Sequence, residues 1–188
     1  MKIPAHLFIF FFVLSLSLKA QKQPAPAAVA VPVDSITKLI TYESVVEVPG
    51  MKANVLYKRA LKWFNTFYKN PTEVIRENDS LKFKIIGKPR FKIMNPPNKD
   101  GVKTDGGLVQ YTITVAAKDG RFKYEITEFN HKEQSYYASE RWMDTKSQTY
   151  LPVYAEYLRQ LDQYTLDLLK NLKDAMLKDK PVKDKDNW

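Results

Sequence analysis

The segment Leu108–Phe129, with the sequence LVQYTITVAAKDGRFKYEITEF, decides the fold. Apolar and polar residues alternate on both sides of the pair Asp119-Gly120. An Asp-Gly pair between two alternating runs is typical of a two-residue type I′ β-hairpin. We therefore predict two long antiparallel strands joined at this turn.

The hydrophobic pattern also predicts the register of this hairpin. With Lys118 opposite Arg121, one face is apolar and pairs Ala117 with Phe122, Val115 with Tyr124 and Ile113 with Ile126. The other face is polar and pairs Ala116 with Lys123, Thr114 with Glu125 and Thr112 with Thr127. A slip of one residue would bury Lys123 and Glu125, so the register is strongly specified. A sheet with one apolar face needs a second layer on that face only.

Two helices are predicted to supply this layer. Apolar residues recur at steps of three and four from Lys52 to Tyr68 and again from Pro152 to Lys180, as on one face of a helix. Shorter strands are expected at Tyr42–Val48 and Glu73–Asn78. A further strand is expected in two pieces, Leu81–Gly87 and Arg90–Met94, with a bulge between them at Gly87 and Pro89, followed by a turn-rich loop at Asn95–Gly107. The fold class is therefore α+β: a two-layer domain with an antiparallel sheet of about five strands and two helices on one face.

The first twenty residues have the pattern of a secretory signal peptide. Lys2 precedes the apolar run Leu7–Leu18, and the small residue Ala20 follows it. The run is shorter than the roughly 20 residues that cross a bilayer, so we expect cleavage, with a retained anchor as the alternative. The predicted organisation is a signal peptide at 1–20, a Pro/Ala-rich linker at 21–40, a single α+β domain at 41–178 and a polar tail at 179–188. The protein is then exported, periplasmic or secreted, with no transmembrane anchor after cleavage.

Composition excludes several kinds of chemistry. The chain has no cysteine and only two histidines, which rules out a disulfide framework and thiolate metal sites. His6 leaves with the signal peptide, and so do two lysines, which lowers the net charge from +9 to +7. The remaining lysines are dispersed, as on a solvated surface, although a basic balance also suits acidic partners. We expect no metal and no cofactor.

Three stretches form a recognisable pattern: VVEVPG at Val45–Gly50, Leu56–Ala60 with Trp63-Phe64-Asn65, and KDGRFKYEI at Lys118–Ile126. This pattern resembles the domain of unknown function 4468 family, found in exported proteins of Bacteroidetes. The resemblance covers about half the chain. It implies a curved antiparallel sheet with helices on one face, in a TATA-binding-protein-like fold, but it carries no activity and no site residues. DNA binding is not expected, because the predicted polar face has mixed charge and no apolar wedges.

No catalytic residues are predicted. His131 follows the hairpin and is expected in a solvated loop, and no Gly-x-Ser-x-Gly turn presents Ser135 or Ser139 to it. Glu125 lies on the outer face of the predicted hairpin and Glu128 on the inner side, so these two carboxylates do not converge.

The candidate binding surface is the set of aromatic residues Tyr136, Tyr137, Trp142 and Tyr150 in the connection after Asn130. Such residues suit a partly wet binding site, or they close one end of the core. We predict a non-catalytic envelope protein, a binding or interaction module for an unknown protein or small ligand, with no nucleic acid. The alternative is a carrier of a small apolar ligand, held under the last helix by residues such as Tyr157, Leu161, Tyr164, Ile113 and Val115. An enzyme is the third hypothesis.

Overall fold

The computed structural model describes residues 30–178, so the predicted signal peptide, residues 21–29 of the linker and the tail lie outside the described residues. The elements in chain order are β1 (Tyr42–Glu47), α1 (Ala53–Phe67), α2 (Pro71–Val74), β2 (Ile75–Asp79), β3 (Lys84–Gly87), β4 (Arg90–Met94), β5 (Asp105–Lys118), β6 (Arg121–Lys132), β7 (Tyr136–Ala138), the 3-10 helix η1 (Ser139–Met143) and α3 (Tyr154–Leu177). The division into linker, domain and tail stays a prediction.

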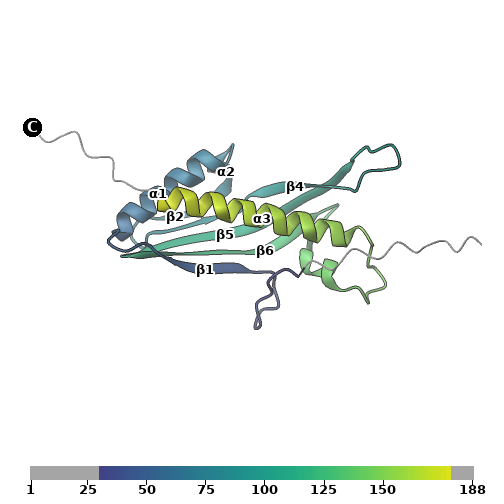
Figure 1. Ribbon diagram of the computed structural model, residues 1–188, viewed down its shortest axis with the longest axis horizontal. Coiled ribbons are helices and arrows are strands. Elements are labelled where there is room, and N and C mark those ends of the chain that lie inside the picture. The colour runs from purple at the N-terminus through teal and green to yellow at the C-terminus, as the bar shows by residue number, and fades with distance from the viewer. Residues whose placement is uncertain (1–29, 179–188) are drawn as a thin grey trace, which may run out of the picture.

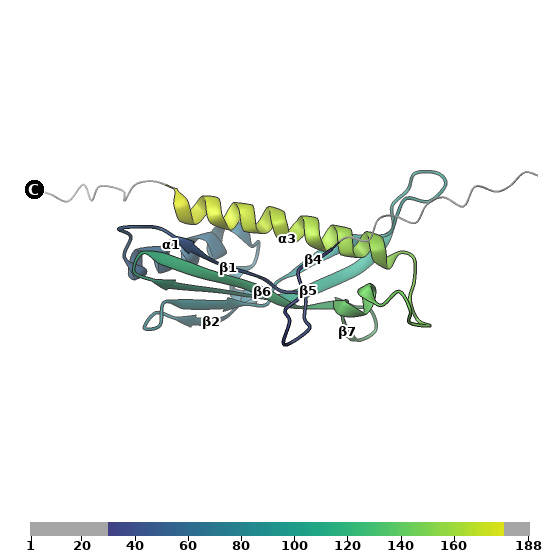
Figure 2. The same cartoon turned by 60° about the horizontal axis from the view of Figure 1, so that its bottom comes forward.

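The predicted two-layer α+β class is confirmed. One antiparallel sheet has the strand order β1-β6-β5-β3-β2, while β4 pairs with the outer part of β5 and β7 pairs with the end of β6. Helices α1 and α3 lie on the same face of this sheet, and the other face is open (Figures 1 and 2). The sheet has seven strands rather than about five, because the connection after the hairpin adds β7 and the chain around Pro89 forms two separate strands.

The predicted hairpin register is also confirmed. Lys118 pairs with Arg121, and each inner and outer pair from Thr112 to Ala117 has the expected partner. Gly120 takes the left-handed conformation that the turn requires, with φ +77°. The Asp119 carboxylate accepts a hydrogen bond from the backbone N–H of Ala53 (2.8 Å), so the turn also caps the start of α1.

A β-bulge changes which residues of β6 face the helices. Thr112 pairs with Thr127, but Gln110 pairs with Asn130, so β6 has one extra residue here. Glu128 lies in this bulge with φ +54°. Before the bulge the even-numbered residues of β6 are buried, and after it the odd-numbered residues are.

The bulge corrects two sequence predictions. Glu128, expected on the inner side, is exposed and accepts a hydrogen bond from the outer-face hydroxyl of Thr112 (2.6 Å). His131, expected in a solvated loop, is the penultimate residue of β6 and is only 3% exposed. The prediction for Glu128 assumed a regular strand, and the prediction for His131 assumed that the strand had ended. In the structure the strand inserts one residue at the bulge and then continues.

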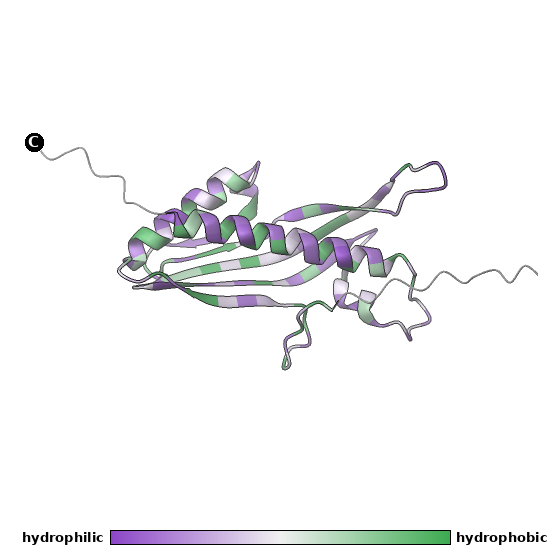
Figure 3. Ribbon diagram, viewed as in Figure 1, coloured by the Kyte–Doolittle hydropathy of each residue, from purple (hydrophilic) through white to green (hydrophobic). Residues whose placement is uncertain are grey.

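The core lies between the sheet and the two helices. Leu56 and Phe64 of α1 and Leu161 and Leu172 of α3 are fully buried. Trp63 also packs in the core, and its Nε1–H donates to Asn171 of α3 (2.8 Å). Figure 3 shows hydrophobic and hydrophilic residues alternating along β5 and β6 and around α3, which is the pattern from which these elements were predicted.

Side chains fill the space that the carrier hypothesis requires. Leu161 and Ile113 are fully buried, and the Tyr164 ring stacks on Phe91 with 4.0 Å between ring centroids. The Tyr164 hydroxyl lies 3.1 Å from that of Tyr111, which lies 3.2 Å from that of Tyr68. This region is packed core, which counts against a ligand cavity at the predicted residues.

The chain before β1 folds back on itself. Val33 forms an antiparallel bridge with Ile40, and the backbone N–H of Thr41 donates to the carbonyl oxygen of Pro32 (3.0 Å). Ile40 is fully buried, and its N–H donates to the carboxylate of Glu140 in η1 (2.8 Å). The end of the predicted linker is thus packed against the domain.

Candidate functional site

The four aromatic residues predicted as a binding surface separate into two groups. Tyr136 and Tyr137 lie on the marginal strand β7 and are 46% and 41% exposed. Trp142 lies in η1, is 1% exposed and belongs to the core, while Tyr150 is half-buried with its ring edge-on to Tyr154. The structure therefore leaves only the two tyrosines as an accessible pair.

Cations of the same chain lie over both exposed tyrosine rings. Lys132 Nζ is 5.7 Å from the centroid of Tyr136, and the Arg141 guanidinium is 4.3 Å from the centroid of Tyr137. Distances within about 6 Å allow a favourable cation–π contact. One ring face of each tyrosine is thus occupied, and this pair offers less open aromatic surface than the sequence suggests.

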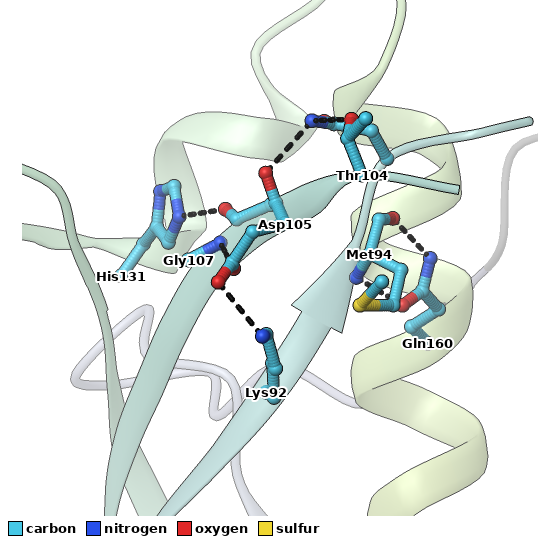
Figure 4. Close-up of polar contacts among 9 residues, drawn as sticks. Lys92, Met94, Thr104, Asp105, Gly107, His131 and Gln160 are labelled. Atoms are coloured by element: carbon cyan, nitrogen blue, oxygen red, sulfur yellow. Dashed lines mark hydrogen bonds and ion pairs between the residues drawn. The ribbon is translucent and has the colours of Figure 1, made fainter. Parts of the chain in front are cut away.

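His131 is enclosed beside this aromatic pair. Its Nε2 lies 2.8 Å from the carbonyl oxygen of Gly106, which can only accept, so Nε2 carries the proton (Figure 4). Trp142 and Tyr157 pack against the ring, with centroids 5.3 and 5.7 Å away. The imidazole joins the start of β5 to the end of β6 and has a packing role.

The surroundings of His131 do not form a catalytic triad. The imidazole Nδ1 lies 3.3 Å from a Glu133 oxygen that Arg141 also contacts. Ser139 is fully buried, and neither its hydroxyl nor that of Ser135 hydrogen bonds to the ring within the described residues. Over residues 30–178, no group of three or more histidine or acidic side chains is arranged to hold a metal ion.

The loop between β4 and β5 is tied to α3 at its base. The Gln160 side-chain amide donates to the carbonyl of Met94 (2.8 Å) and accepts from its N–H (2.9 Å), as a neighbouring strand would (Figure 4). Asn95 donates to the hydroxyl of Thr104 across the loop (3.0 Å), and Lys92 pairs with Asp105 (2.8 Å). These contacts fix the ends of the predicted Asn95–Gly107 loop, which leaves its polar tip as the exposed part.

A hollow on the helical side of the sheet runs between α3 and β1. Its volume is about 620 Å³, and its walls include Pro32, Tyr42, Tyr124, Leu166, Leu169, Lys170, Lys173, Asp174 and Leu177. Leu166 and Leu177 are 48% and 45% exposed. The sequence predicted a pocket between the last helix and the sheet, but at Tyr157, Leu161 and Tyr164, whereas this groove is lined by other residues of α3. The lining was missed because the position of α3 across the sheet follows from tertiary packing, and the one signal was the pair of leucines outside the main apolar stripe of the helix.

Among residues 30–178, no strand pairs with the outer edge of β1 along the same groove. Alternate residues of an antiparallel strand direct their backbone groups to opposite neighbours. The N–H of Val48 donates to the carbonyl of Gly120 in the β5–β6 turn (2.7 Å), whereas the N–H of Thr41 points away from β6 and donates to Pro32. By this alternation Glu43, Val45 and Glu47 direct their backbone groups outward from the edge of the sheet. These residues follow the positions, Ile40 and Thr41, with which Val33 and Pro32 pair.

The open face of the sheet is polar, as predicted, and its charges are mostly paired. Lys123 contacts Glu43 (2.6 Å) and Glu125 (3.5 Å), and the hydrogen bond to Glu43 raises the pKa of Lys123. Lys84 contacts Glu77 (3.2 Å) on the neighbouring strands. None of the described helices, between residues 30 and 178, has an apolar stretch long enough to cross a membrane.

The comparisons with known proteins agree on the fold. A crystal structure of a DUF4468 family protein from Bacteroides ovatus superposes with a TM-score of 0.63 at 20% identity, covering 79% of this chain and 94% of that one. A TBP-like protein from Parabacteroides distasonis gives a TM-score of 0.60 at 14% identity, covering 80% and 99%. At these identities the likeness concerns the fold alone. No curated protein matches the sequence.

The family assignment rests on the sequence of the sheet and of α1. Residues 42–132, from the start of β1 to the end of β6, match the family described as a domain of unknown function with a TBP-like fold. This range contains the hairpin and the helix on which the resemblance was based. The resemblance to the DUF4468 family is therefore confirmed over residues 42–132.

Proposed function

We propose that this protein is a non-catalytic binding module of the bacterial cell envelope that recognises an extended segment of a partner protein. The segment adds a strand to the open edge of β1 and places alternate side chains in the groove between β1 and α3. Recognition of this kind takes affinity from backbone hydrogen bonds and specificity from the pockets for side chains.

One observation carries this proposal. The segment of this chain before β1 already pairs antiparallel with the edge, through the Val33–Ile40 bridge and the bond from Thr41 to Pro32 (3.0 Å). That pairing ends where the groove begins, since Pro32, Thr41 and Tyr42 line its end. The edge accepts an extended strand at this end, and the backbone groups of Glu43, Val45 and Glu47 have the same orientation as those of Thr41.

The groove and the edge define the chemistry of the partner segment. Side chains that point toward α3 would meet Tyr42, Leu166 and Leu177, so these positions favour apolar residues. Side chains that point to the open face would lie opposite Glu43 and Glu47, so these positions favour Lys or Arg. The partner segment is an alternating apolar and basic strand.

Other features support the remaining parts of the proposal. The pattern of Met1–Ala20 supports export to the envelope. The enclosed position of His131, whose Nε2 is bound to Gly106, supports a role without acid–base catalysis. An exposed strand edge promotes aggregation, and a partner strand that pairs with the edge would prevent this.

The test is selection of random displayed peptides on the folded protein, followed by amide hydrogen exchange with a selected peptide. Binding should slow exchange at Glu43, Val45 and Glu47, because these amides gain hydrogen bonds. The amides of Tyr42, Ser44 and Val46 face β6 and should change much less. Selected peptides should alternate apolar and basic residues.

Two variants at one position provide the matched control. Val45→Pro removes the central N–H of the edge while leaving the bonds to β6, and it should abolish peptide binding. Val45→Thr keeps the N–H and the β-branched shape and should bind as the wild type does. Equal binding by both variants, or protection that maps to another surface, contradicts the proposal.

A further inference from the structure

The open face of the sheet has a hollow of about 420 Å³ next to the β5–β6 turn. It is lined by Val45, Lys82, Ala116, Ala117, Lys118, Arg121 and Lys123. Ala116 lines the hollow, and its cross-strand neighbours are Lys84 on β3 and Lys123 on β6. Long side chains therefore stand on both sides of a single methyl group.

The walls of this hollow are cationic and aliphatic. Lys82 is paired with Asp79 (3.2 Å) and Lys123 with Glu43 (2.6 Å). Lys118 and Arg121 form no ion pair with any of residues 30–178. Between the charged ends, the surface consists of Ala116, the 52% exposed Val45 and the methylene stems of the lysines.

Lys118 and Arg121 are direct cross-strand partners. Both side chains are exposed on the open face. Like charges directly opposite each other destabilise a pair of strands. An anion bound between the two groups would remove this repulsion and would accept charge-assisted hydrogen bonds from both. Arg121 also lies opposite Glu47 of β1, with which it forms no ion pair, so an anion would compete with Glu47 for Arg121. Within the hairpin, a ligand anion can convert the like-charge pair into a favourable triplet.

We propose that this hollow is a binding site for an anionic group attached to an aliphatic chain, as in a fatty acid or an anionic lipid. The anion lies between Lys118 and Arg121, and the aliphatic part lies over Ala116 and against Val45. The volume is within the range of roughly 300–1,000 Å³ that is typical of small-molecule sites. The site is on the opposite face of the sheet from the groove of the proposed function and does not depend on it.

The test is an NMR titration of the folded protein with decanoate below its micellar concentration. The amides of residues 116–118 and 121–123 should shift together and saturate. Two variants should each raise the dissociation constant by about tenfold or more: Lys118→Gln with Arg121→Gln, which removes the charges, and Ala116→Phe, which fills the hollow. The matched control is Lys58→Gln with Lys62→Gln on the exposed side of α1, which removes the same charge and should bind as the wild type does.

A second arm of the experiment identifies the source of the anion. Vesicles of phosphatidylglycerol are compared with vesicles of phosphatidylcholine. Leu81, next to Lys82 in the β2–β3 turn, is 91% exposed and would enter the bilayer interface. If the ligand is a membrane lipid, Leu81→Ser weakens binding to the anionic vesicles. If the ligand is a free amphiphile, decanoate binds and Leu81→Ser has no effect.

Three results would overturn the proposal. The first is that neither decanoate nor anionic vesicles bind. The second is that binding persists in the variant without Lys118 and Arg121. The third is that inorganic phosphate binds as tightly as decanoate, which removes the role of the aliphatic part. The thermal unfolding transition of each variant shows whether it folds. The charge variant and Ala116→Phe disrupt the site in different ways, so the test can still be made if one of them does not fold.

Discussion

Gly107 lies so close to His131 that a Cβ atom on the glycine would be 2.7 Å from the imidazole Nε2. The preceding residue, Gly106, supplies the carbonyl oxygen that binds the same nitrogen (2.8 Å). The start of β5 and the end of β6 therefore meet through a glycine pair and one buried imidazole.

Gly107→Ala should destabilise the protein through two effects. The residue has φ +102°, where an L side chain is strained by about 1–3 kcal/mol, and the new methyl group would displace His131. Gly120→Ala is the control, because Gly120 has φ +77° and nothing within 4 Å of the added methyl group. Urea unfolding should show a clearly larger loss for Gly107. Equal losses would mean that the contact with His131 contributes nothing.

The pKa of Glu128 should depend on Thr112. The hydrogen bond from the Thr112 hydroxyl, and secondarily the contact with Lys88, lower the pKa of this carboxyl below its ordinary value. Because the pKa is lower in the folded state, the carboxylate stabilises the fold at neutral pH, and that contribution is lost as the pH falls through the folded pKa. Thr112→Val should raise the pKa of Glu128 toward its ordinary value.

An NMR titration of the Glu128 side-chain carboxyl measures this change. Thr114→Val is the control, because Thr114 is the next residue of β5 on the same face and its cross-strand partner is Glu125. A pKa of Glu128 that responds equally to both substitutions would contradict the assigned cause.

Two leucines of α3 should differ sharply in their contribution to stability. Leu161 is fully buried and Leu166 is 48% exposed. Leu161→Ala should cost about 2–5 kcal/mol, because it leaves a cavity in packed core. Leu166→Ala should change the free energy of unfolding by no more than about 0.5 kcal/mol. A small loss at Leu161 would indicate a loosely filled core and would restore the carrier hypothesis.

The free energy of unfolding should also distinguish the buried from the exposed residues of the predicted aromatic surface. Trp142→Ala should cost about 3–5 kcal/mol, since the indole is 1% exposed between His131 and Tyr157. Tyr136→Ala should cost about 1 kcal/mol or less, the contribution of an exposed ring with one cation contact. Thermal unfolding of both variants checks this, and a costly Tyr136 substitution would place β7 in the structural core.

Much of the fold could be predicted because its patterns are local. The Asp-Gly turn and the alternation on both sides of it specify the hairpin and its register, which the structure reproduces from Thr112 to Arg121. The steps of three and four in α1 and α3 specify which faces are buried. The aromatic surface was predicted less well, because Trp142 and Tyr136 look alike in sequence and differ only in what covers them.

The bulge at Glu128 marks the limit of pattern reasoning within one strand. Phe129 follows the inner residue Ile126 at an odd spacing, and this was the one signal that the alternation shifts. Its consequence, that His131 points inward, depends on the conformation of a single residue with φ +54°. A regular strand and a bulged strand have nearly the same sequence, so the choice is made by packing under α3.

The sequence by itself determined the class of this protein, its hairpin register and its two amphipathic helices, because periodicity within a segment shows which side chains avoid water. The tertiary structure alone decided where α3 crosses the sheet, which edge stays open beside it and which cations surround Ala116. These features join residues that are far apart in the chain, and their positions follow from the packing of whole elements, which no local pattern encodes.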